Sequence, residues 1–418
     1  MAAPRPFHIV IWGATGFTGR LVCEHVARDY KGQVKWAMAG RNKQRLEEIR
    51  QELSKTYGED LKDVPILLGD INDQPSIDAI AKDTHVIVST AGPFMRLGKP
   101  IVDAAVRQGT HYCDITGETN YVMDLIKTYD EQAKAKNVRI VPCCGYDSIP
   151  SDLGAFFVAD YIKKELGKQT AKVVNVILSG KGGVSGGTVA SGMELVEAAK
   201  RPGVPQDTGV YSHVPPAAPK GDDKEVWGPA YEPTLKKWVA PFIMQVINNR
   251  VVHRSAALLG YGDSFHYQEG IATSGWLAAS AVAVGTAATA LALSQVWVHP
   301  LLKRVLPAPG QGPSRDAMLN GHYKHSIVGY TQEAGGAKPT VVVAELGDPK
   351  RDPGYWGTSR MLLEAGLCLA LQQGELDRRQ PVKGGVLTPA TAMGSFLIER
   401  LRKAGLTYEV KEVMRPQQ

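Results

Sequence analysis

The amino-acid sequence predicts an α/β protein: an N-terminal, doubly wound parallel sheet followed by a second domain of α+β type. Three observations support this prediction. Short apolar runs alternate with charged helical segments as far as residue 145. A glycine-rich turn follows the first apolar run directly, and beyond residue 150 the apolar runs become longer and alternate in part with polar residues.

Six candidate strands form the first part of the pattern. Each is a nearly continuous apolar run, which is typical of parallel strands whose two faces are both covered by helices. They are Phe7–Trp12, Val34–Ala39, Val64–Leu68, His85–Thr90, Thr110–Ile115 and Val138–Cys144. The segments between them, 18–30, 42–58, 74–83, 98–109 and 122–137, have the composition of helices. Residues 1–150 are therefore predicted to form a Rossmann dinucleotide-binding domain.

Residues 151–385 are predicted to form a second, substrate-binding domain. A helix is expected to follow Pro150, and longer strands are expected at 171–179, 322–332 and 339–347. Proline- and glycine-rich stretches at 201–233 and 306–313 are expected to be loops. The last segment, 386–418, is expected to form a helix and a strand, with Thr388 as a suitable N-cap for one helix that Gly405 would end.

Composition excludes several classes of function. The net charge of +6 over 418 residues is modest and the basic residues are dispersed, which disfavours a nucleic-acid partner. The five cysteines lack a C-x-x-C spacing and are odd in number, so we expect a reducing, intracellular compartment. His111, His266 and His299 have no metal-ligand spacing, so no metal is predicted. The first strand begins near Phe7, which leaves no room for an N-terminal targeting peptide.

The glycine-rich turn is a candidate cofactor site. Gly13, Gly16 and Gly19 have G-x-x-G-x-x-G spacing, and the residues between them are Ala14, Thr15, Phe17 and Thr18. Such a turn, placed after a strand and before a helix, lets backbone N–H groups approach a pyrophosphate. The alternative is an ordinary strand-to-helix loop, but the alternating strands and helices around it favour nucleotide binding.

The residues after the second strand indicate which dinucleotide binds. NAD-binding domains usually have an acidic residue here for the ribose 2′-hydroxyl, whereas this chain has Arg41 and Asn42, with Lys43 and Arg45 nearby. Because positive charge suits a 2′-phosphate, we predict NADP(H) as the cofactor. The alternative is that these basic residues only solvate the start of a helix.

Two further strand ends are expected to line the cofactor crevice, because ligands in such sheets bind beyond the carboxyl ends of the strands. Asp70 could hydrogen-bond the adenine amino group or cap the helix that follows it. The small residues Ser89, Ala91 and Gly92, with Pro93, suit a loop that passes close to the nicotinamide ribose.

Eight ordered motifs resemble the saccharopine dehydrogenase-like oxidoreductases, and in particular the branch that contains the trans-acting enoyl reductases. They are GATGFTG (13–19), AGRN (39–42), STAGPF (89–94), YCDITGE (112–118), GYDSIPSDLG (145–154), GGVSGGTVASG (182–192), GPS (312–314) and GGVLTPATAMG (384–394). The resemblance implies a Rossmann domain, a substrate domain after it, and a C-terminal helix that returns to the first domain.

The resemblance also implies an oxidoreductase activity. Saccharopine dehydrogenases bind several carboxylates, but the substrate domain of this chain has no clear cluster of arginines for that purpose. The enoyl reductases of the family instead reduce a carbon–carbon double bond on a lipid-like chain, and the eukaryotic relatives are associated with lipid droplets.

Tyr146 and Asp147 are the candidate catalytic residues. Hydride transfer needs alignment, a dry pocket and a donor for developing negative charge, and these residues follow the sixth strand at the expected domain junction. Tyr146 could donate a proton and Asp147 could orient it. The alternative is that Asp147 and Ser148 cap the following helix. Asp114 and Glu118 could line the same cleft or satisfy backbone groups in a turn.

An apolar segment at 275–302 is long enough to cross a bilayer of about 30 Å as a helix. Family motifs on both sides of it disfavour a single crossing. Three arrangements remain: a hairpin turning near Gly285, an interfacial helix, and a helix buried in the core or in a dimer interface. Trp276 and Trp297 bracket the segment, and Lys303 and Arg304 follow it, which favours contact with a membrane or lipid monolayer.

The sequence thus predicts an NADP(H)-dependent reductase of a hydrophobic or lipid-linked enoyl, keto or imine substrate at a membrane or lipid-droplet surface. Two alternatives stay open: a non-catalytic NADP(H)-binding scaffold on a lipid surface, and a saccharopine-type amino-acid dehydrogenase. Homodimer formation also stays open.

Overall fold

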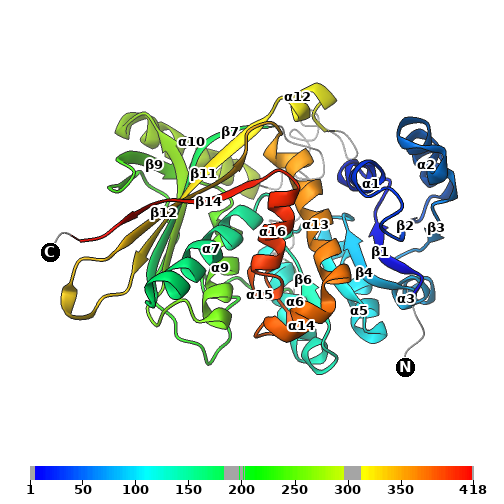
Figure 1. Cartoon of the computed structure of the whole chain (residues 1–418), viewed down its shortest axis with the longest axis horizontal. Helices are drawn as coiled ribbons and strands as arrows, with labels where there is room; N and C mark the ends of the chain where they lie inside the picture. The colour runs from blue at the N-terminus through cyan, green and yellow to red at the C-terminus, as the bar shows by residue number, and fades with distance from the viewer. Residues whose placement is uncertain (1–4, 183–196, 198–200, 202, 296–311, 417–418) are drawn as a thin grey trace.

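Two seven-stranded sheets organise the molecule (Figure 1). The computed structural model describes residues 5–182, 197, 201, 203–295 and 312–416. The first sheet and its helices lie at one end of the molecule, and the second sheet lies at the other, with helices α7, α9, α13 and α16 between them (Figure 1). The bounds of these elements follow below.

The first sheet is parallel throughout and has the spatial order β13–β6–β5–β4–β1–β2–β3. Its strands are β1 (Phe7–Trp12), β2 (Trp36–Gly40), β3 (Ile66–Leu68), β4 (Thr84–Ser89), β5 (His111–Asp114), β6 (Arg139–Val141) and β13 (Gly385–Val386). The order reverses between β1 and β4, as it does in a doubly wound fold. The predicted Rossmann sheet is therefore confirmed, with β13 as an added strand.

Helices cover both faces of this sheet, which explains why its strands are apolar without a break. On β1, Ile9 and Ile11 face one core cluster, whereas Val10 and Trp12 face another. The first cluster is closed by α1 (Phe17–Asp29), α2 (Lys43–Tyr57) and α13 (Thr358–Leu371). The second is closed by α3 (Gln74–Lys82), α5 (Lys99–Gln108) and α6 (Thr119–Ala135).

The second sheet is mixed, with the order β14–β12–β11–β7–β10–β9–β8, and only the β7–β10 pair is parallel. Its strands are β7 (Thr170–Lys181), β8 (Ala230–Glu232), β9 (Lys237–Pro241), β10 (His266–Thr273), β11 (His322–Thr331), β12 (Val341–Asp348) and β14 (Thr407–Met414). The sequence pattern located β7, β11 and β12 but missed β8, β9 and β10. The predicted 201–233 loop accordingly ends in a strand.

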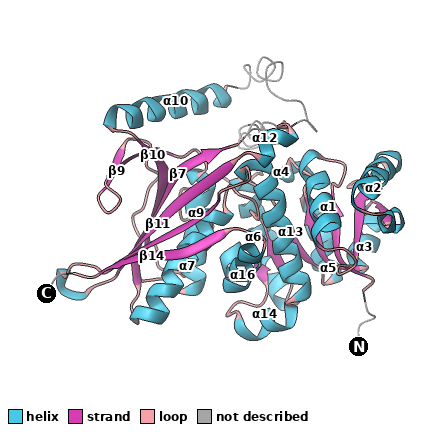
Figure 2. Ribbon diagram, turned by 45° about the horizontal axis from the view of Figure 1, so that its top comes forward, coloured by secondary structure: helices cyan, strands magenta, loops and turns pink. Residues whose placement is uncertain are grey.

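Helices lie on both sides of the second sheet (Figure 2). Helix α7 (Ile149–Leu166) packs on β7, β11 and β12, and α9 (Gln245–Leu259) packs on α7 and β10. Helix α10 (Trp276–Ser294) lies on the opposite side, against β9 and β10. The short helix α12 (Arg315–Leu319) lies near the π-helical turn η4 (Pro353–Gly357), which leads into α13.

The C-terminal part of the chain visits both sheets. After α13 come α14 (Gln373–Arg379), β13, α15 (Pro389–Ala392), α16 (Ser395–Lys403) and finally β14. The prediction of one helix between Thr388 and Gly405 is wrong, because Gly394 has φ +50° and separates α15 from α16. Thr388 does cap α15, in a reciprocal capping box with Thr391.

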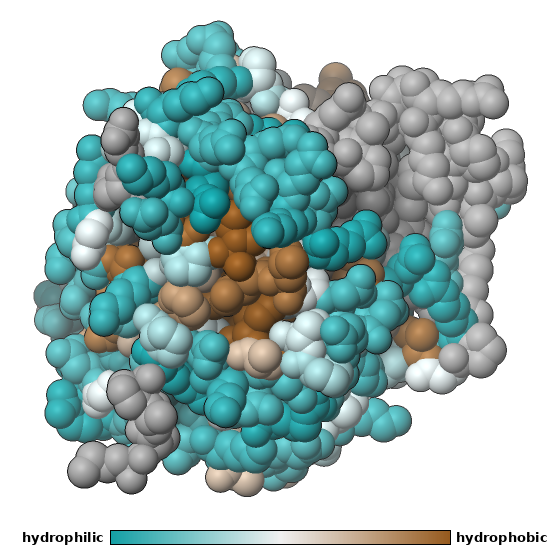
Figure 3. Space-filling view, turned by 90° about the vertical axis from the view of Figure 1, so that its right-hand side faces the viewer, coloured by the Kyte–Doolittle hydropathy of each residue, from teal (hydrophilic) through white to brown (hydrophobic). Residues whose placement is uncertain are grey.

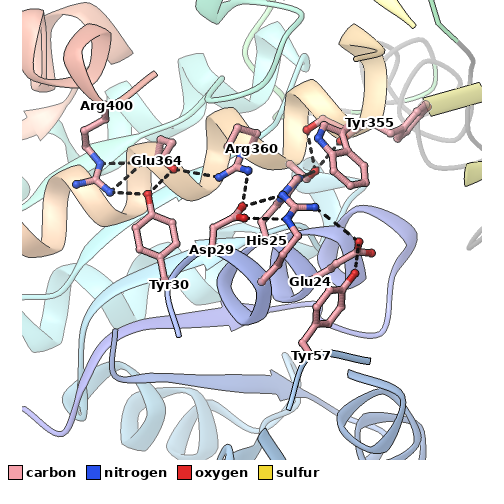
Figure 4. A network of polar contacts seen from close by, with 12 residues as sticks. Glu24, His25, Asp29, Tyr30, Tyr57, Tyr355, Arg360, Glu364 and Arg400 are labelled. Atoms are coloured by element: carbon pink, nitrogen blue, oxygen red, sulfur yellow. Dashed lines mark hydrogen bonds and ion pairs between the residues drawn. The ribbon is translucent and has the colours of Figure 1, made fainter. Parts of the chain in front are cut away.

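A polar network fixes α1 to the C-terminal helices (Figure 4). Arg360 of α13 pairs with Asp29 of α1, and Arg400 of α16 pairs with Glu364 of α13 at 2.8 Å. The hydroxyl of Tyr30, just beyond α1, donates to Glu364 at 2.6 Å. Because α1 starts at the glycine-rich turn, this network helps hold that turn in place.

Residues 276–294 of the apolar segment form helix α10, which runs without a break through Gly285. A hairpin turning near Gly285 is therefore wrong. Burial in the core of this chain is also wrong, because most of the helix is accessible, including Leu277 (77%) and Val284 (70%). Among the described helices, none is both long and apolar enough to cross a bilayer. Residues 296–302 and the glycine-rich stretch 183–192 lie outside the described residues.

Candidate functional site

The carboxyl ends of the parallel strands bring the predicted cofactor residues to one edge of the first sheet. The glycine-rich turn follows β1, Arg41 follows β2, and Asp70 follows β3. On the other side of the strand-order reversal, Ser89 ends β4, and Tyr146 follows β6. An elongated ligand on this edge would cross the reversal between β1 and β4.

The glycines of the turn are required by its geometry. Gly13 has φ +84°, and a Cβ there would lie 2.9 Å from Thr90 Oγ1. At Gly19 a Cβ would lie 2.2 Å from the backbone oxygen of Gly13. No side chain larger than hydrogen fits at Gly19 without separating α1 from the turn.

The start of α1 suits a pyrophosphate. Its N-cap is Gly16, which has no side chain to accept a hydrogen bond from the first turn. The N–H groups of Phe17, Thr18 and Gly19 are in that first turn, where a helix provides no backbone acceptors. The tight turn and the free helix N-terminus together fit the diphosphate of a dinucleotide.

Neighbouring residues hold the turn against the loop that follows β4. The Thr90 amide donates to the Trp12 oxygen at 2.9 Å, and the Thr90 hydroxyl donates to the Gly13 oxygen at 3.1 Å. Ala14 is buried, whereas Thr15, Phe17 and Thr18 are partly exposed. The Phe17 ring packs edge-on against the Tyr355 ring, with ring centroids 5.3 Å apart.

Arg41 lies at the carboxyl end of β2 and is exposed. Asn42 is the N-cap of α2, and its side-chain oxygen accepts from the Arg45 amide at 3.0 Å. Lys43 pairs with Glu47 and Arg45 pairs with Glu48 on the surface of α2, whereas Arg41 forms no ion pair with any described residue. Arg41 is therefore a cation available to a ligand at the place where a 2′-phosphate would lie.

The change Arg41→Ala tests this assignment. The dissociation constant of NADPH should rise by about 10- to 100-fold, because a charge-assisted contact contributes about 1.5–3 kcal/mol. The constant for NADH should change little, since NADH has no 2′-phosphate. Titration of nicotinamide fluorescence measures both, with Arg45→Ala as the matched control. An equal loss for NADPH and NADH would contradict the role of Arg41.

The other two strand ends are shaped by local hydrogen bonds. Asp70 Oδ1 accepts from the Asn72 amide at 2.8 Å, and the N-cap of α3 is Asp73, so Asp70 does not cap that helix. Ser89 is buried, and Ala91, Gly92 and Pro93 lead into the short helix α4 (Phe94–Leu97) through a cis Gly92–Pro93 bond.

Asp114 and Glu118 satisfy backbone groups, as the alternative interpretation expected. Glu118 accepts from the Phe94 and Met95 amides, both at 2.8 Å, and thus holds the start of α4. Asp114 accepts from the Thr116 amide at 2.9 Å, and burial raises the pKa of Asp114 to about 7. These carboxyl groups position the loop beside the predicted nicotinamide site.

Tyr146 and Asp147 lie between β6 of the first sheet and α7, the helix that packs on the second sheet. Tyr146 is partly exposed, and its hydroxyl hydrogen-bonds His325 of β11 at 3.0 Å rather than Asp147. Asp147 is exposed as a residue, but the protein atoms packed around its carboxyl group desolvate that group and raise its pKa to about 6. Ser148 is the N-cap of α7 by position but makes no capping hydrogen bond. The side chain of Asp147 has no partner among the described residues, so the capping alternative is wrong.

Sequence reasoning missed His325, which ends up beside Tyr146 although they are far apart in the chain. The alternation along β11 places Tyr323, His325 and Ile327 on one face, and all three are buried. That alternation was the available signal, but it could not show which residue His325 would meet.

One described group could approach a metal ion: donor atoms of Asp222, Asp223 and His266 lie within 4.8 Å of one another. The two carboxylate oxygens of Asp223 already face His253 at 2.9 Å and His266 at 2.6 Å. These contacts account for the cluster, and we assign no metal to it.

The end of the molecule that carries α2 and β3 has an apolar patch framed by hydrophilic side chains (Figure 3). The edge strand β3 lies at this end of the first sheet, and its Leu68 is 49% exposed. This face belongs to the half of the sheet that would bind the adenosine portion of a dinucleotide.

Comparison with known proteins agrees with this geometry. Residues 9–141 match the family described as the saccharopine dehydrogenase NADP binding domain. A Mycobacterium tuberculosis protein named as a trans-acting enoyl reductase is 38% identical, and the alignment covers 98% of each chain. The trans-acting enoyl reductase of Mycobacterium leprae is 34% identical over 96% of this chain and 97% of the relative.

A solved structure also matches nearly the whole chain. Saccharopine dehydrogenase (L-Glu forming) from Saccharomyces cerevisiae superposes with a TM-score of 0.51 over 97% of this chain and 99% of that chain. The sequence identity of 12% limits this likeness to the fold.

Proposed function

This chain belongs to the saccharopine dehydrogenase-like, NADP(H)-binding oxidoreductases, in the branch of the trans-acting enoyl reductases, and we propose that it reduces a hydrophobic or lipid-linked substrate. The reducible group is an enoyl, keto or imine group, and the names of the relatives favour the enoyl group. The observation that carries the proposal is the desolvated carboxyl of Asp147, which has no partner among the described residues and follows β6 on the cofactor edge of the first sheet.

Asp147 is proposed to supply the proton that accompanies reduction. Bound NADPH supplies a hydride to the substrate. The substrate then needs a proton, and a carboxyl group whose pKa is about 6 is partly protonated near neutral pH. Tyr146, which directly precedes Asp147 in the chain, is proposed to contact the bound cofactor or substrate as well. Ser89, Ala91, Gly92 and Pro93 are proposed to line the cofactor on the opposite side.

Two buried arginines of the second domain support an uncharged substrate over a tricarboxylate. Arg250 of α9 is buried and pairs with Asp207 and Glu225, both at 2.7 Å. Arg254, on the same helix, is buried and donates to the backbone oxygen of Val386. These cations already have partners within the protein, so they are poor candidates for binding the carboxylates of saccharopine.

Helix α10 is proposed to contact a membrane or lipid monolayer. It has no charged residue, and Trp276 (52%) and Leu291 (66%) are exposed. The neighbouring hairpin places Tyr231 against Trp238, with ring centroids 5.4 Å apart, beside exposed lysines 236 and 237. Exposed apolar side chains with flanking aromatic and basic residues suit the interface of a lipid layer.

Turnover measures the proposed activity directly. The purified protein should oxidise NADPH in the presence of a long-chain 2-enoyl thioester, and the product should be the saturated thioester. Matching long-chain keto and imine compounds separate the three reducible groups. Binding of NADPH without turnover of any of them would favour the scaffold alternative, and turnover of saccharopine would favour the amino-acid dehydrogenase.

Replacing three exposed side chains of α10 tests the lipid contact. The triple change Trp276→Ser, Leu277→Ser and Val284→Ser should lower partitioning to phospholipid vesicles by about tenfold or more, because burial of even one apolar side chain contributes about 1.5–3 kcal/mol. Co-sedimentation measures it, with Leu371→Ser, an exposed leucine on another helix, as the control. Unchanged partitioning together with dissociation of a dimer would assign the helix to a dimer interface instead.

A further inference from the structure

A buried chain of hydrogen bonds runs inward from Tyr146 into the second domain. Tyr146 Oη lies 3.0 Å from His325 Nε2, and His325 Nδ1 lies 3.0 Å from Asn175 Oδ1. The Asn175 amide nitrogen then donates to Ser151 Oγ at 3.1 Å. Ser151 donates to Glu269 at 2.7 Å, which ends the chain. All but Tyr146 are buried.

The Glu269 end sets the direction of these hydrogen bonds. Ser151 and Tyr267 both donate their hydroxyl hydrogens to Glu269 Oε2, each at 2.7 Å, and the Asn248 amide donates to Oε1 at 2.9 Å. With Glu269 ionised and held by three donors, the two hydroxyl groups that donate to it can only accept from Asn175, so the amide nitrogen of Asn175 faces them.

The orientation of Asn175 selects the tautomer of His325. Since the nitrogen of the Asn175 amide faces the hydroxyl groups, its oxygen faces His325 and accepts a hydrogen bond from Nδ1. Burial lowers the pKa of His325 to about 3, so the ring is neutral and carries one hydrogen, on Nδ1. Nε2 is then an acceptor, and the Tyr146 hydroxyl is the only hydrogen-bond donor that the described residues place there.

We propose that the hydrogen-bond chain from Glu269 through His325 directs the Tyr146 hydroxyl hydrogen toward His325, so that the lone pairs of the Tyr146 oxygen are left to accept a hydrogen bond from a ligand. Tyr146 therefore binds an N–H or O–H donor of a ligand and does not supply the proton for reduction. His325 and Asn175 are positioning residues. The inference builds on the proposed function, because it leaves the proton to Asp147.

Two candidate donors share this chemistry: the carboxamide of the nicotinamide ring and a hydroxyl or amide group of the substrate. Both would lie on the carboxyl edge of the first sheet, where Tyr146 follows β6. The Tyr146 ring packs edge-on against the rings of Tyr323 and His325, with ring centroids 4.9 Å and 5.7 Å apart. The position of the Tyr146 oxygen is therefore fixed before a ligand binds.

Nitrogen-15 NMR of histidine-labelled protein tests the tautomer without any turnover. The expected result is a neutral His325 with hydrogen on Nδ1 at pH 7, identified by loss of its signals in His325→Gln. A hydrogen on Nε2, or on both nitrogens, would overturn the proposal. This readout stands even if the protein reduces no enoyl, keto or imine substrate.

Variants of His325 separate positioning from proton transfer. In His325→Gln the new amide can accept from Tyr146 and donate to Asn175, as the His325 ring with hydrogen on Nδ1 does. The values of kcat and KM should therefore stay within about threefold of the wild type. His325→Leu should raise the KM or the cofactor dissociation constant by about tenfold, as expected for one misplaced hydrogen bond. Equal loss of kcat in both variants would show that His325 carries a proton, against the proposal.

Tyr146→Phe distinguishes an acceptor from a proton donor. Loss of an acceptor should weaken ligand binding by about tenfold, whereas loss of a general acid should lower kcat by about 100- to 10,000-fold. Titration with NADP⁺ and with its 3-acetylpyridine analogue, which lacks the carboxamide N–H, locates the donor. If the affinity for NADP⁺ falls but that for the analogue does not, the donor belongs to the cofactor. If only the KM for the substrate rises, the donor belongs to the substrate. If neither binding constant changes, Tyr146 is not an acceptor.

Discussion

Replacing Gly19 with alanine is expected to weaken NADPH binding by at least about 100-fold, or about 2.8 kcal/mol. The new Cβ would lie 2.2 Å from the Gly13 oxygen and 2.8 Å from Thr90 Oγ1. Because the nearest atom belongs to the backbone, the clash is relieved only if α1 moves away from the turn. That movement displaces the N–H groups that face the pyrophosphate. Fluorescence titration with NADPH measures the loss.

Gly374→Ala is the matched control for this change. Gly374 lies in α14, and a Cβ added there would have no neighbouring atom within 4 Å. Alanine also favours a helix over glycine. This variant should bind NADPH like the wild type and be as stable or slightly more stable. Unfolding curves of both variants separate a lost site from a lost fold. A folded Gly19→Ala variant with unchanged NADPH affinity would contradict the predicted location of the pyrophosphate.

Asp147→Asn is expected to lower kcat by about 100- to 10,000-fold, because an amide cannot donate the proton that a carboxylic acid donates. NADPH affinity should stay within about threefold, since Asp147 is not among the residues proposed to hold the cofactor. Steady-state kinetics with the enoyl substrate measure kcat, and fluorescence titration measures binding. Asp263→Asn, at an exposed aspartate elsewhere on the second domain, is the control.

The pH profile of the wild type provides a second test of Asp147. Its pKa is raised to about 6, so the protonated form predominates below pH 6 and falls about tenfold per unit well above it. The kcat for reduction should therefore be highest at low pH and fall as the pH rises through about 6. Asp147→Asn should lose this dependence. A variant that keeps both the dependence and the kcat would exclude Asp147 as the proton donor.

Much of the first domain was predictable because its signals are local. A run such as Phe7–Trp12 is buried on both faces, and such runs alternate with amphipathic helices along the chain. The glycine spacing and the position of Arg41 after a strand can also be recognised within a short stretch of the sequence. The predicted ends of β1 agree with the observed ends, whereas the ends of other elements differ by up to three residues, as for β6, because the last residues of a strand depend on its partners.

The second domain was less predictable because its elements depend on distant partners. Strands β8 and β9 are short and lie in a stretch rich in proline and polar residues, and β9 gains its pairing from β10. Helix α9 carries buried polar residues, among them Asn248, Arg250 and His253, so its apolar periodicity is weak. Hydrogen bonds and ion pairs from residues 207–226 and from β10 satisfy these buried polar groups. No local sequence pattern indicates these distant partners.

The sequence by itself determined the Rossmann sheet, the glycine-rich turn and the preference for NADP(H), because each follows from short stretches whose residues act on their neighbours. Tertiary structure alone decided what Tyr146 and Asp147 face. His325, Asn175 and Glu269 come from three strands of the second sheet, and they join the chain that ends at Tyr146 only after that sheet has packed on α7. The sequence selected Tyr146 by its place after a strand, whereas the direction of its hydroxyl hydrogen depends on a buried chain of donors and acceptors that exists only in the folded protein.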